Sequence, residues 1–324
     1  MCVGPTLTQS NTPAVPLEPS TLPPLVATSG LDAQDGGPEI DIVDRLNAQT
    51  KRLAAKSKSE PGDEDYACLQ LVKGGATVFK HRFWPLLYLY WAYTAYGIVT
   101  APSLAFAIGA FILTYIYIDL YGAVLHIVLD NPNFLKLPLL GEACLEFQFH
   151  HIIPHEITVR SYIHIAADLN GIIGLQYGWH LFLFKGLGDP AFRCLACCAV
   201  LNAYLGQLAH RQAHMLPEKR DPVVDVLQRL GLMVAPDTHR RHHKTYDQGF
   251  PILSGWCDAP ITFLFQHIVS SQWIWLSAFL LLTFGGIAGV ARLYLPVFAW
   301  AMEGKGWEGA WEGAAESWSR SSML

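Results

Sequence analysis

Long uncharged stretches alternate with polar segments through the middle and C-terminal parts of the chain. Residues 83–118 contain no Asp, Glu, Lys or Arg, and this length is enough for two membrane crossings of about 20 residues each. Pro102 divides the stretch, because proline disfavours helical backbone at the residue that precedes it. The pattern therefore predicts one apolar helix before Thr100 and a second that begins near Leu104.

Three further segments continue the pattern. Residues 163–184 and 192–208 predict a third and a fourth span, and an uncharged stretch near 273–290 predicts a candidate fifth. Residues 221–235 mix apolar and charged positions and are too short to cross, so they suit a helix that lies in the membrane interface. The predicted fold class is all-α: a polytopic membrane helical bundle of about four spans and a candidate fifth.

The composition indicates that lipid surrounds much of this chain. Of its 324 residues, 52% are hydrophobic and only 15% are charged, against about a quarter charged in typical soluble proteins. The net charge of -5 gives no electrostatic support for a nucleic-acid partner.

Four regions are expected along the chain. They are a disordered cytosolic tail over residues 1–75, the membrane domain over 76–260, a C-terminal apolar or interfacial segment with the candidate extra span over 261–300, and a tail over 301–324. Residues 1–44 contain no Lys or Arg, which argues against a secretory signal peptide and against an Arg-rich transit peptide.

Eight histidines and one aspartate fall in four short groups within the predicted membrane domain. The groups are His126 with Asp130, His150 with His151, His210 with His214, and His239 with His242 and His243. Imidazole is a favoured ligand of iron, zinc and copper. Eight imidazoles are about the number that two metal ions need at roughly four ligands each. The groups therefore predict a site for two metal ions.

The spacing within the groups indicates which histidines can bind the same metal ion. His210 and His214 stand four residues apart, so on a helix they share one face. The neighbours His150 and His151 diverge by about 100° on a helix, which suits two different ions better than one. Neutral imidazole is the binding form, so metal affinity is expected to fall below about pH 6.

Topology lets the four groups meet on one side of the membrane. The second and fourth predicted spans cross in the same direction, and their C-terminal ends carry two of the groups, while the loops that follow carry the other two. Basic residues precede the first span and surround the later histidines. By the positive-inside rule, the histidine-rich cap that holds the two metals faces the cytosol.

Not every histidine is assigned to the metals. A lone histidine in an apolar helix is more often a packed core residue than a ligand, and this interpretation is given to His81, His164, His180 and His267. His155 is also placed outside the ligand set. The alternative for the His239 group is a basic patch that faces lipid headgroups, because Arg240, Arg241 and Lys244 accompany it.

The groups as a set resemble a known family of membrane lipid desaturases. The motifs are Gly122-x-x-x-His126-x-x-x-Asp130, Phe147-Gln-Phe-His150-His151-x-x-Pro154-x-x-Ile157-Thr158-x-Arg160, Gln207-x-x-His210-x-x-x-His214, and His239-x-x-His242-His243 followed by Ile252-x-Ser254-Gly255-Trp256. They resemble the histidine boxes of plasmanylethanolamine desaturase, the bacterial CarF protein, the plant Kua proteins and the plastid desaturase that makes trans-3-hexadecenoate. The resemblance covers residues 122–258.

Four positions depart from the family pattern. Ile127 stands where a tryptophan commonly follows the first histidine, Val159 interrupts an Ile-Thr-Arg run, and Phe250-Pro251 replaces Tyr-Cys. Phe147 also leaves the second box short of a full His-x-x-His-His, which is usual in this family. The departures leave the predicted metal ligands intact and leave the lipid specificity open.

The resemblance implies an O₂-dependent enzyme with two iron ions. The implied iron ligands are His126, His150, His151, His210, His214, His239, His242 and His243. Asp130 is implied as a ligand or as a catalytic group beside the metals, and Asp168, Gln207 and Asp258 are expected to orient the ligands. The implied reaction removes two hydrogens from an alkyl or acyl chain of a phospholipid. Electrons would come from cytochrome b5 and its reductase, or from a ferredoxin-like donor. The expected location is the endoplasmic reticulum membrane, with the plastid membrane as the alternative.

Two other functions stay open. A di-iron hydroxylase uses similar histidine boxes, and no residue here separates the two outcomes. A metal transporter or metal-sensing membrane protein would place paired ligands at mid-membrane, whereas these ligands cluster at span ends and in loops. Iron rather than zinc rests on the resemblance, because imidazoles alone also bind zinc.

Overall fold

The computed structural model describes residues 84–131, 133–134, 137–152, 154, 156–184 and 189–303. These residues belong to one unit of the chain, Ile42–Leu324. All regular structure within them is helical, which confirms the predicted all-α class. The predicted tail over residues 1–75 lies outside the described residues, as does the predicted C-terminal tail from residue 304 onwards.

Three of the described helices are long and apolar enough to cross a membrane. They are α4 (Leu104–Leu129), α9 (Pro190–His214) and α13 (Gln272–Glu303), and they correspond to the second, fourth and fifth predicted spans. The start of α4 is set by Ser103, whose hydroxyl accepts a hydrogen bond from Phe106 N. The start of α9 is set by Asp189 in the same way, with Pro190 in the first turn.

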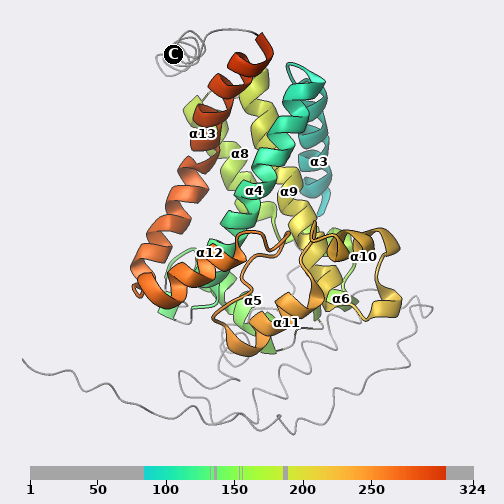
Figure 1. Cartoon of the computed structure of the whole chain (residues 1–324), viewed down its shortest axis with the longest axis vertical. Helices are drawn as coiled ribbons and strands as arrows, with labels where there is room; N and C mark the ends of the chain where they lie inside the picture. The colour runs from blue at the N-terminus through green and yellow to red at the C-terminus, as the bar shows by residue number, and fades with distance from the viewer. Residues whose placement is uncertain are drawn as a thin grey trace, which may run out of the picture. The chain divides into compact units, whose positions relative to one another are not determined.

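Two shorter apolar helices lie beside these three (Figure 1). They are α3 (Trp84–Val99), with 16 residues, and α8 (Asn170–Phe184), with 15. At 1.5 Å per residue they span roughly 22–24 Å, less than the hydrocarbon core of about 30 Å. The predicted third span is divided, because Tyr162–Ala167 forms a separate short helix, α7, before a turn at Asp168.

Two of the three long helices run in opposite directions. Tyr294 near the end of α13 donates a hydrogen bond to Phe106 O near the start of α4 (2.9 Å). Asn131, directly after α4, donates to Gln272 at the start of α13 (3.1 Å). These two contacts make α4 and α13 antiparallel. The remaining long helix, α9, runs parallel to α4, so both finish at the same end of the bundle.

Shorter helices gather at that end (Figure 1). They are α5 (Gly141–Ile152), α6 (Glu156–Val159), α10 (Pro222–Arg229), α11 (Pro236–Thr245) and α12 (Asp258–Phe263), together with a 3-10 turn at Pro217–Lys219 and a π turn at Leu264–Ile268. The expected interfacial segment contains α10, whose 8 residues are too few to cross a membrane. The helix ends and the short helices together position the four histidine groups.

Candidate metal centre

Five imidazoles from three helices converge on one point. They are His150 on α5, His210 and His214 on α9, and His239 and His243 on α11. One ring nitrogen of each lies within 4.8 Å of the corresponding nitrogen of every other. His150, His210 and His239 are buried, at 8%, 6% and 1% exposure. We call this set the five-histidine group.

Hydrogen bonding alone does not account for this arrangement. The Nε2 atoms of His150, His210 and His214 contact each other pairwise, at 3.1, 3.1 and 3.3 Å. Each Nε2 carries either a hydrogen or a lone pair, so among three mutually contacting atoms at least two are alike. One of the three contacts therefore pairs two donors or two acceptors. A cation that takes a lone pair from each nitrogen removes this conflict.

The distances also fit a metal ion. His239 Nε2 lies 2.8 Å from His214 Nε2, and His243 Nε2 lies 3.0 Å from His239 Nε2. Two nitrogens bound at about 2.1 Å from one metal, at right angles, are about 3.0 Å apart. The group therefore has the separations of neighbouring ligands around a single ion.

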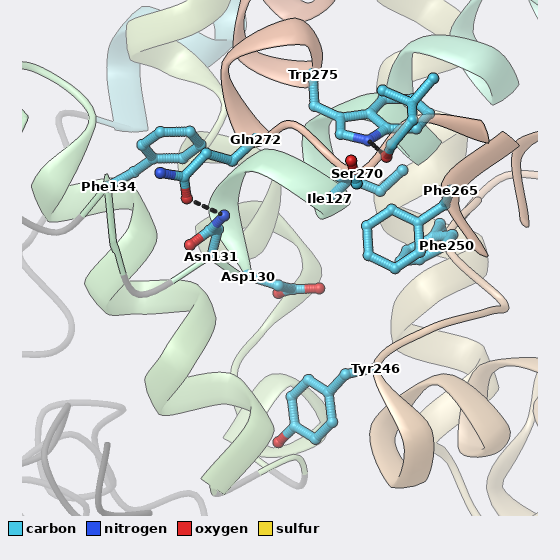
Figure 2. A pocket seen from close by; sticks show the side chains of 11 residues that line it. Ile127, Asp130, Asn131, Phe134, Tyr246, Phe250, Phe265, Ser270, Gln272 and Trp275 are labelled. Atoms are coloured by element: carbon cyan, nitrogen blue, oxygen red, sulfur yellow. Dashed lines mark hydrogen bonds between the residues drawn. The ribbon is translucent and has the colours of Figure 1, made fainter. Parts of the chain in front are cut away.

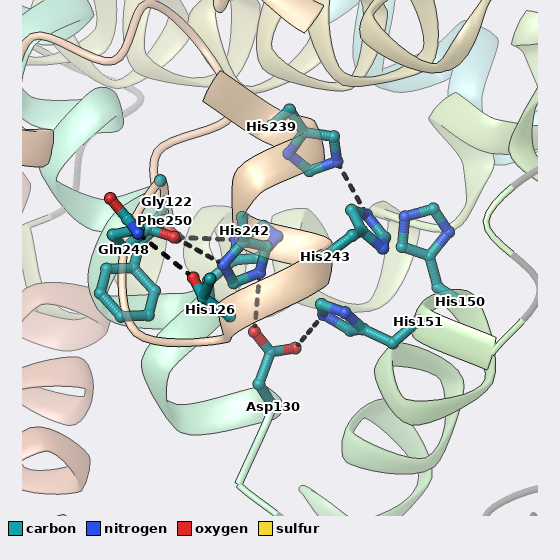
Figure 3. A network of polar contacts seen from close by, with 12 residues as sticks. Gly122, His126, Asp130, His150, His151, His239, His242, His243, Gln248 and Phe250 are labelled. Carbon is teal, nitrogen blue, oxygen red and sulfur yellow. Dashed lines mark hydrogen bonds and ion pairs between the residues drawn. The ribbon is translucent and has the colours of Figure 1, made fainter. Parts of the chain in front are cut away.

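A second group lies beside the first and contains a carboxylate. Asp130, which caps the end of α4, lies with its Oδ1 2.9 Å from His151 Nε2 and with its Oδ2 3.1 Å from His242 Nε2 (Figure 3). The three residues have ligand atoms close enough to share an ion. We call them the Asp130 group. The rings of His151 and His243 lie 4.4 Å apart between centroids, so the two groups adjoin.

The tautomer of His242 supports a cation in the Asp130 group. His242 Nδ1 lies 3.0 Å from Gln248 O, and a carbonyl can only accept, so Nδ1 carries the hydrogen. A neutral His242 then presents the lone pair of Nε2 to the Asp130 carboxylate. Two acceptors face one another unless His242 is protonated or a metal ion lies between them.

His126 is the eighth predicted ligand and lies next to both groups without belonging to either. It is 1% exposed, and its Nδ1 donates to Gly122 O (3.1 Å), which leaves the lone pair on Nε2. Its ring centroid is 5.3 Å from that of His242 and 6.0 Å from that of His210. The structure therefore brings seven of the eight predicted histidines into the two groups and holds His126 beside them.

Burial keeps the ligands in the protonation states that bind metals. Burial and the neighbouring imidazoles hold the pKa of His150 and of His239 well below the ordinary value. Burial raises the pKa of the Asp130 carboxyl, but the contacts with His151 and His242 outweigh that effect and lower the pKa below its usual value. His150 and His239 therefore stay neutral and Asp130 stays ionised at mildly acidic pH, which are the forms that bind metal ions.

Asp119 is a structural carboxylate that the sequence motifs did not identify. It is 0% exposed in α4 and accepts hydrogen bonds from the backbone N–H groups of Ser254 (2.7 Å), Gly255 (3.0 Å) and Cys257 (2.9 Å). These bonds fasten the loop after α11 to the helix that carries His126 and Asp130. The sequence feature that could have identified Asp119 is an acidic residue within an apolar helix.

The three residues expected to orient the ligands lie in different surroundings. Asp258 accepts hydrogen bonds from Gly249 N (2.8 Å) and Phe250 N (3.2 Å), and so it holds the backbone next to the Gln248 carbonyl that contacts His242. Asp168 pairs with Arg160 (2.8 Å) and is a member of neither metal group. Gln207 lies on α9 one turn before the ligands, and no described hydrogen bond uses its side chain.

Gly249 gives a test of how the Gln248 carbonyl positions His242. Gly249 has φ 71, and a Cβ there would lie 2.7 Å from Thr238 O and 3.1 Å from His242 Cβ. We expect Gly249→Ala to displace the carbonyl and weaken metal binding by about 10- to 100-fold, the usual cost of losing a partner that orients a ligand. Metal affinity is measured by competition with a chelator.

The matched control is Gly231→Ala. Gly231 has φ 68 but no atom within 4 Å of the added Cβ, so the variant carries the same backbone strain of about 1–2 kcal/mol without touching the site. Equal metal affinities for the two variants would show that the Gln248 carbonyl does not position His242.

Comparison with known proteins shows which proteins this part of the chain is similar to. Residues 115–269 match the lipid desaturase domain. The chain is 32% identical over 142 residues to "Fatty acid desaturase 4, chloroplastic" of Arabidopsis thaliana, covering 44% of this chain and 43% of that protein. It is 28% identical over 160 residues to "Plasmanylethanolamine desaturase" of Myxococcus xanthus, covering 48% of this chain and 56% of that protein.

The chain thus spans about half the length of the curated relatives it matches. No solved structure matches it. Both metal groups and the Asp119 contacts that brace them fall inside the matched range. Over residues 115–269 this chain is therefore similar to the lipid desaturase domain family, and the candidate metal centre lies within that range.

Proposed function

We propose that this chain is an integral membrane lipid desaturase that holds one iron ion in each of its two metal groups. Its substrate would be an alkyl or acyl chain of a membrane phospholipid. The observation that carries the proposal is the pair of adjoining groups, one made only of imidazoles and one with a carboxylate, inside a lipid desaturase domain. The Asp130 group supports iron, because two histidines and one carboxylate with open positions are typical of non-haem iron(II) sites that use O₂.

The reaction needs an external electron donor. When bound, a reduced iron pair supplies the activation of O₂. Removal of two hydrogens from adjacent carbons gives O₂ two electrons and two protons. The donor gives two more electrons and the solvent gives two more protons, so two waters form with one carbon–carbon double bond. Cytochrome b5 with its reductase, or a ferredoxin-like protein, fits this role on the histidine side of the membrane.

The residues of the chain shield this chemistry from water as well as holding the metals. The Phe147 ring packs edge-on against His126 (5.0 Å between centroids), and the Phe250 ring packs in the same way against His242 (5.5 Å). The Tyr246 ring stacks on His151 (4.5 Å). Aromatic walls of this kind exclude solvent from reactive species and strengthen electrostatic interactions inside the site.

Two alternative functions, hydroxylation and metal transport, differ from desaturation in the product or in where the metal ligands lie. Hydroxylation would use the same ligands and differ only in the insertion of one oxygen atom. Transport would need ligands along the spans, whereas both groups lie at the ends of α4 and α9 and on the short helices beyond them. This placement favours an enzyme over a transporter.

The proposal is tested by lipid analysis in cells that lack plasmanylethanolamine desaturase. We expect expression of the full chain to produce phospholipids that are two hydrogens lighter than their precursors, measured by mass spectrometry against an empty-vector control. Vinyl-ether lipids would identify an alkyl chain as the substrate, and a new double bond in an ester-linked chain would identify an acyl chain. A product heavier by one oxygen atom would show a hydroxylase instead.

Metal content and location complete the test. The purified protein is expected to contain about two iron ions, since each group has ligands for one. Zinc in both groups, with no change in cellular lipids, would contradict the proposal. Cell fractionation decides between the endoplasmic reticulum expected from the sequence and the plastid named for the Arabidopsis relative.

A further inference from the structure

A cavity of about 320 Å³ adjoins the Asp130 group, and Asp130 is the only proposed metal ligand among the described residues that line it. Ile127 and Asp130 line it from the end of α4, Trp275 lines it from the start of α13, and Phe250 and Phe265 line it from the segments between α11 and α13. Ligand cavities range from about 300 to 1,000 Å³. This one is therefore large enough for a section of a lipid and too small for a whole phospholipid.

The two amide side chains of the cavity lie on one side of it, across from two aromatic rings. Figure 2 shows Asn131 and Gln272 on one side and Phe250 and Phe265 on the other, with Asp130 between them. Gln272 Oε1 accepts hydrogen bonds from Asn131 Nδ2 (3.1 Å) and from Asn133 Nδ2 (2.9 Å), which occupies both of its lone pairs. No described hydrogen bond uses Gln272 Nε2, so this amide nitrogen is the donor available to a ligand.

The depth of the cavity indicates which section of a lipid it meets. The cavity lies where α4 finishes and α13 begins, at the ends of two membrane-length helices. Such ends lie near the boundary between the hydrocarbon core and the headgroups. At that depth a phospholipid presents the ester or ether oxygen of each chain, and the first chain carbons lie directly below.

We propose that this cavity binds a membrane phospholipid at the polar linkage of one chain, with Gln272 Nε2 donating to an oxygen of that linkage. The first carbons of the chain then lie against the aromatic wall, beside Asp130. The proposal rests on the proposed desaturase function and adds to it. Gln272 is then a positioning residue, because it holds the linkage in place. The carbon that reacts lies at a fixed distance from the linkage and not from the methyl end of the chain.

Photocrosslinking tests the binding site without requiring turnover. The probe is a phosphatidylethanolamine with a diazirine close to the ester of one chain, added to the full-length protein in nanodiscs. We expect the label on residues that line the cavity, such as Ile127, Phe250 or Trp275. Labelling confined to the outer faces of the long helices would overturn the proposal.

Two pairs of variants sharpen the test. Ser270 lies exposed at the rim of the cavity, so Ser270→Trp is expected to fold and to reduce cavity labelling by about tenfold or more. Ser277→Trp, at an exposed position on α13 outside the cavity, is expected to label like the unchanged protein. Equal labelling of both variants would count against the cavity as the binding site.

Gln272→Glu tests whether the Nε2 donor of Gln272 binds the lipid. The new carboxylate still accepts from Asn131 and Asn133 but has no N–H and repels a linkage oxygen, so we expect about tenfold less labelling with unchanged metal content. Gln266→Glu, an exposed change on the π turn, is the control. Normal labelling of Gln272→Glu would overturn the role of Gln272. Cavity labelling without any lipid product in cells would leave the binding site standing and reject the desaturase function.

Discussion

Replacement of His242 by alanine is expected to remove the metal ion of the Asp130 group and to abolish lipid desaturation. The His242 ring is fully buried, at 0% exposure, and bridges the Gln248 carbonyl (3.0 Å) and the Asp130 carboxylate (3.1 Å). Without it, Asp130 and His151 are too few ligands to hold an ion. Loss of a residue that only orients a ligand costs about 10- to 100-fold in affinity, so loss of a ligand is expected to cost at least the upper end of that range.

The five-histidine group does not include His242, so His242→Ala is expected to keep about one of the two proposed metal ions. Metal analysis of the purified protein and lipid profiling of the expressing cells measure the two effects. His267→Ala is the control, because His267 is exposed in the π turn and, among the described rings, lies beside only that of Phe263 (5.2 Å between centroids). Wild-type turnover by His242→Ala at matched expression would remove His242 from the site.

Helical periodicity made the ligand pairs predictable. His210 and His214, four residues apart, enter the same group, as do His239 and His243. Adjacent residues on a helix diverge by about 100°, and His150 and His151 accordingly enter different groups. Spacing within one helix did not decide every pair, because His242, three residues after His239, enters the Asp130 group, and His126, four residues before Asp130, enters neither group.

The backbone contacts that hold the site in place could not be predicted from helical spacing. Asp119 contacts backbone groups 135 to 138 residues later in the chain, and the carbonyl that orients His242 belongs to Gln248. Every residue type carries a backbone carbonyl and all except proline carry a backbone N–H, so residue identity does not mark which ones receive a contact. The lengths of α3 and α8 could not be predicted from the sequence either, because hydropathy does not show where an apolar segment turns.

Asp168 shows why residue type alone is a weak guide to the ligands. It was expected to orient the metal ligands because a carboxylate within a membrane segment is a functional candidate. The structure pairs it with Arg160, which also donates to His164 O (3.3 Å). The pair fastens the turn between α7 and α8, and this turn ends what otherwise resembles one continuous span.

Asp130→Asn is expected to reduce the metal content by about half, since one of two ions is lost, and to bring desaturation to background. The wild-type carboxyl is ionised, because His151 and His242 lower its pKa despite burial. The amide has almost the same shape but no charge, and one of its two terminal atoms is a donor without a lone pair for a metal. The fold is therefore expected to persist while the ligand set of the Asp130 group fails.

Asp168→Asn is the matched control, with the same chemical change in the same membrane domain. It weakens the ion pair with Arg160 (2.8 Å), and we expect a loss of about 1–2 kcal/mol in the free energy of unfolding with unchanged metal content. Thermal unfolding and metal analysis of both variants in one detergent separate a structural carboxylate from a ligand. Equal metal loss from the two variants would mean that Asp130 acts through the stability of the domain, and the ligand role assigned to it would be wrong.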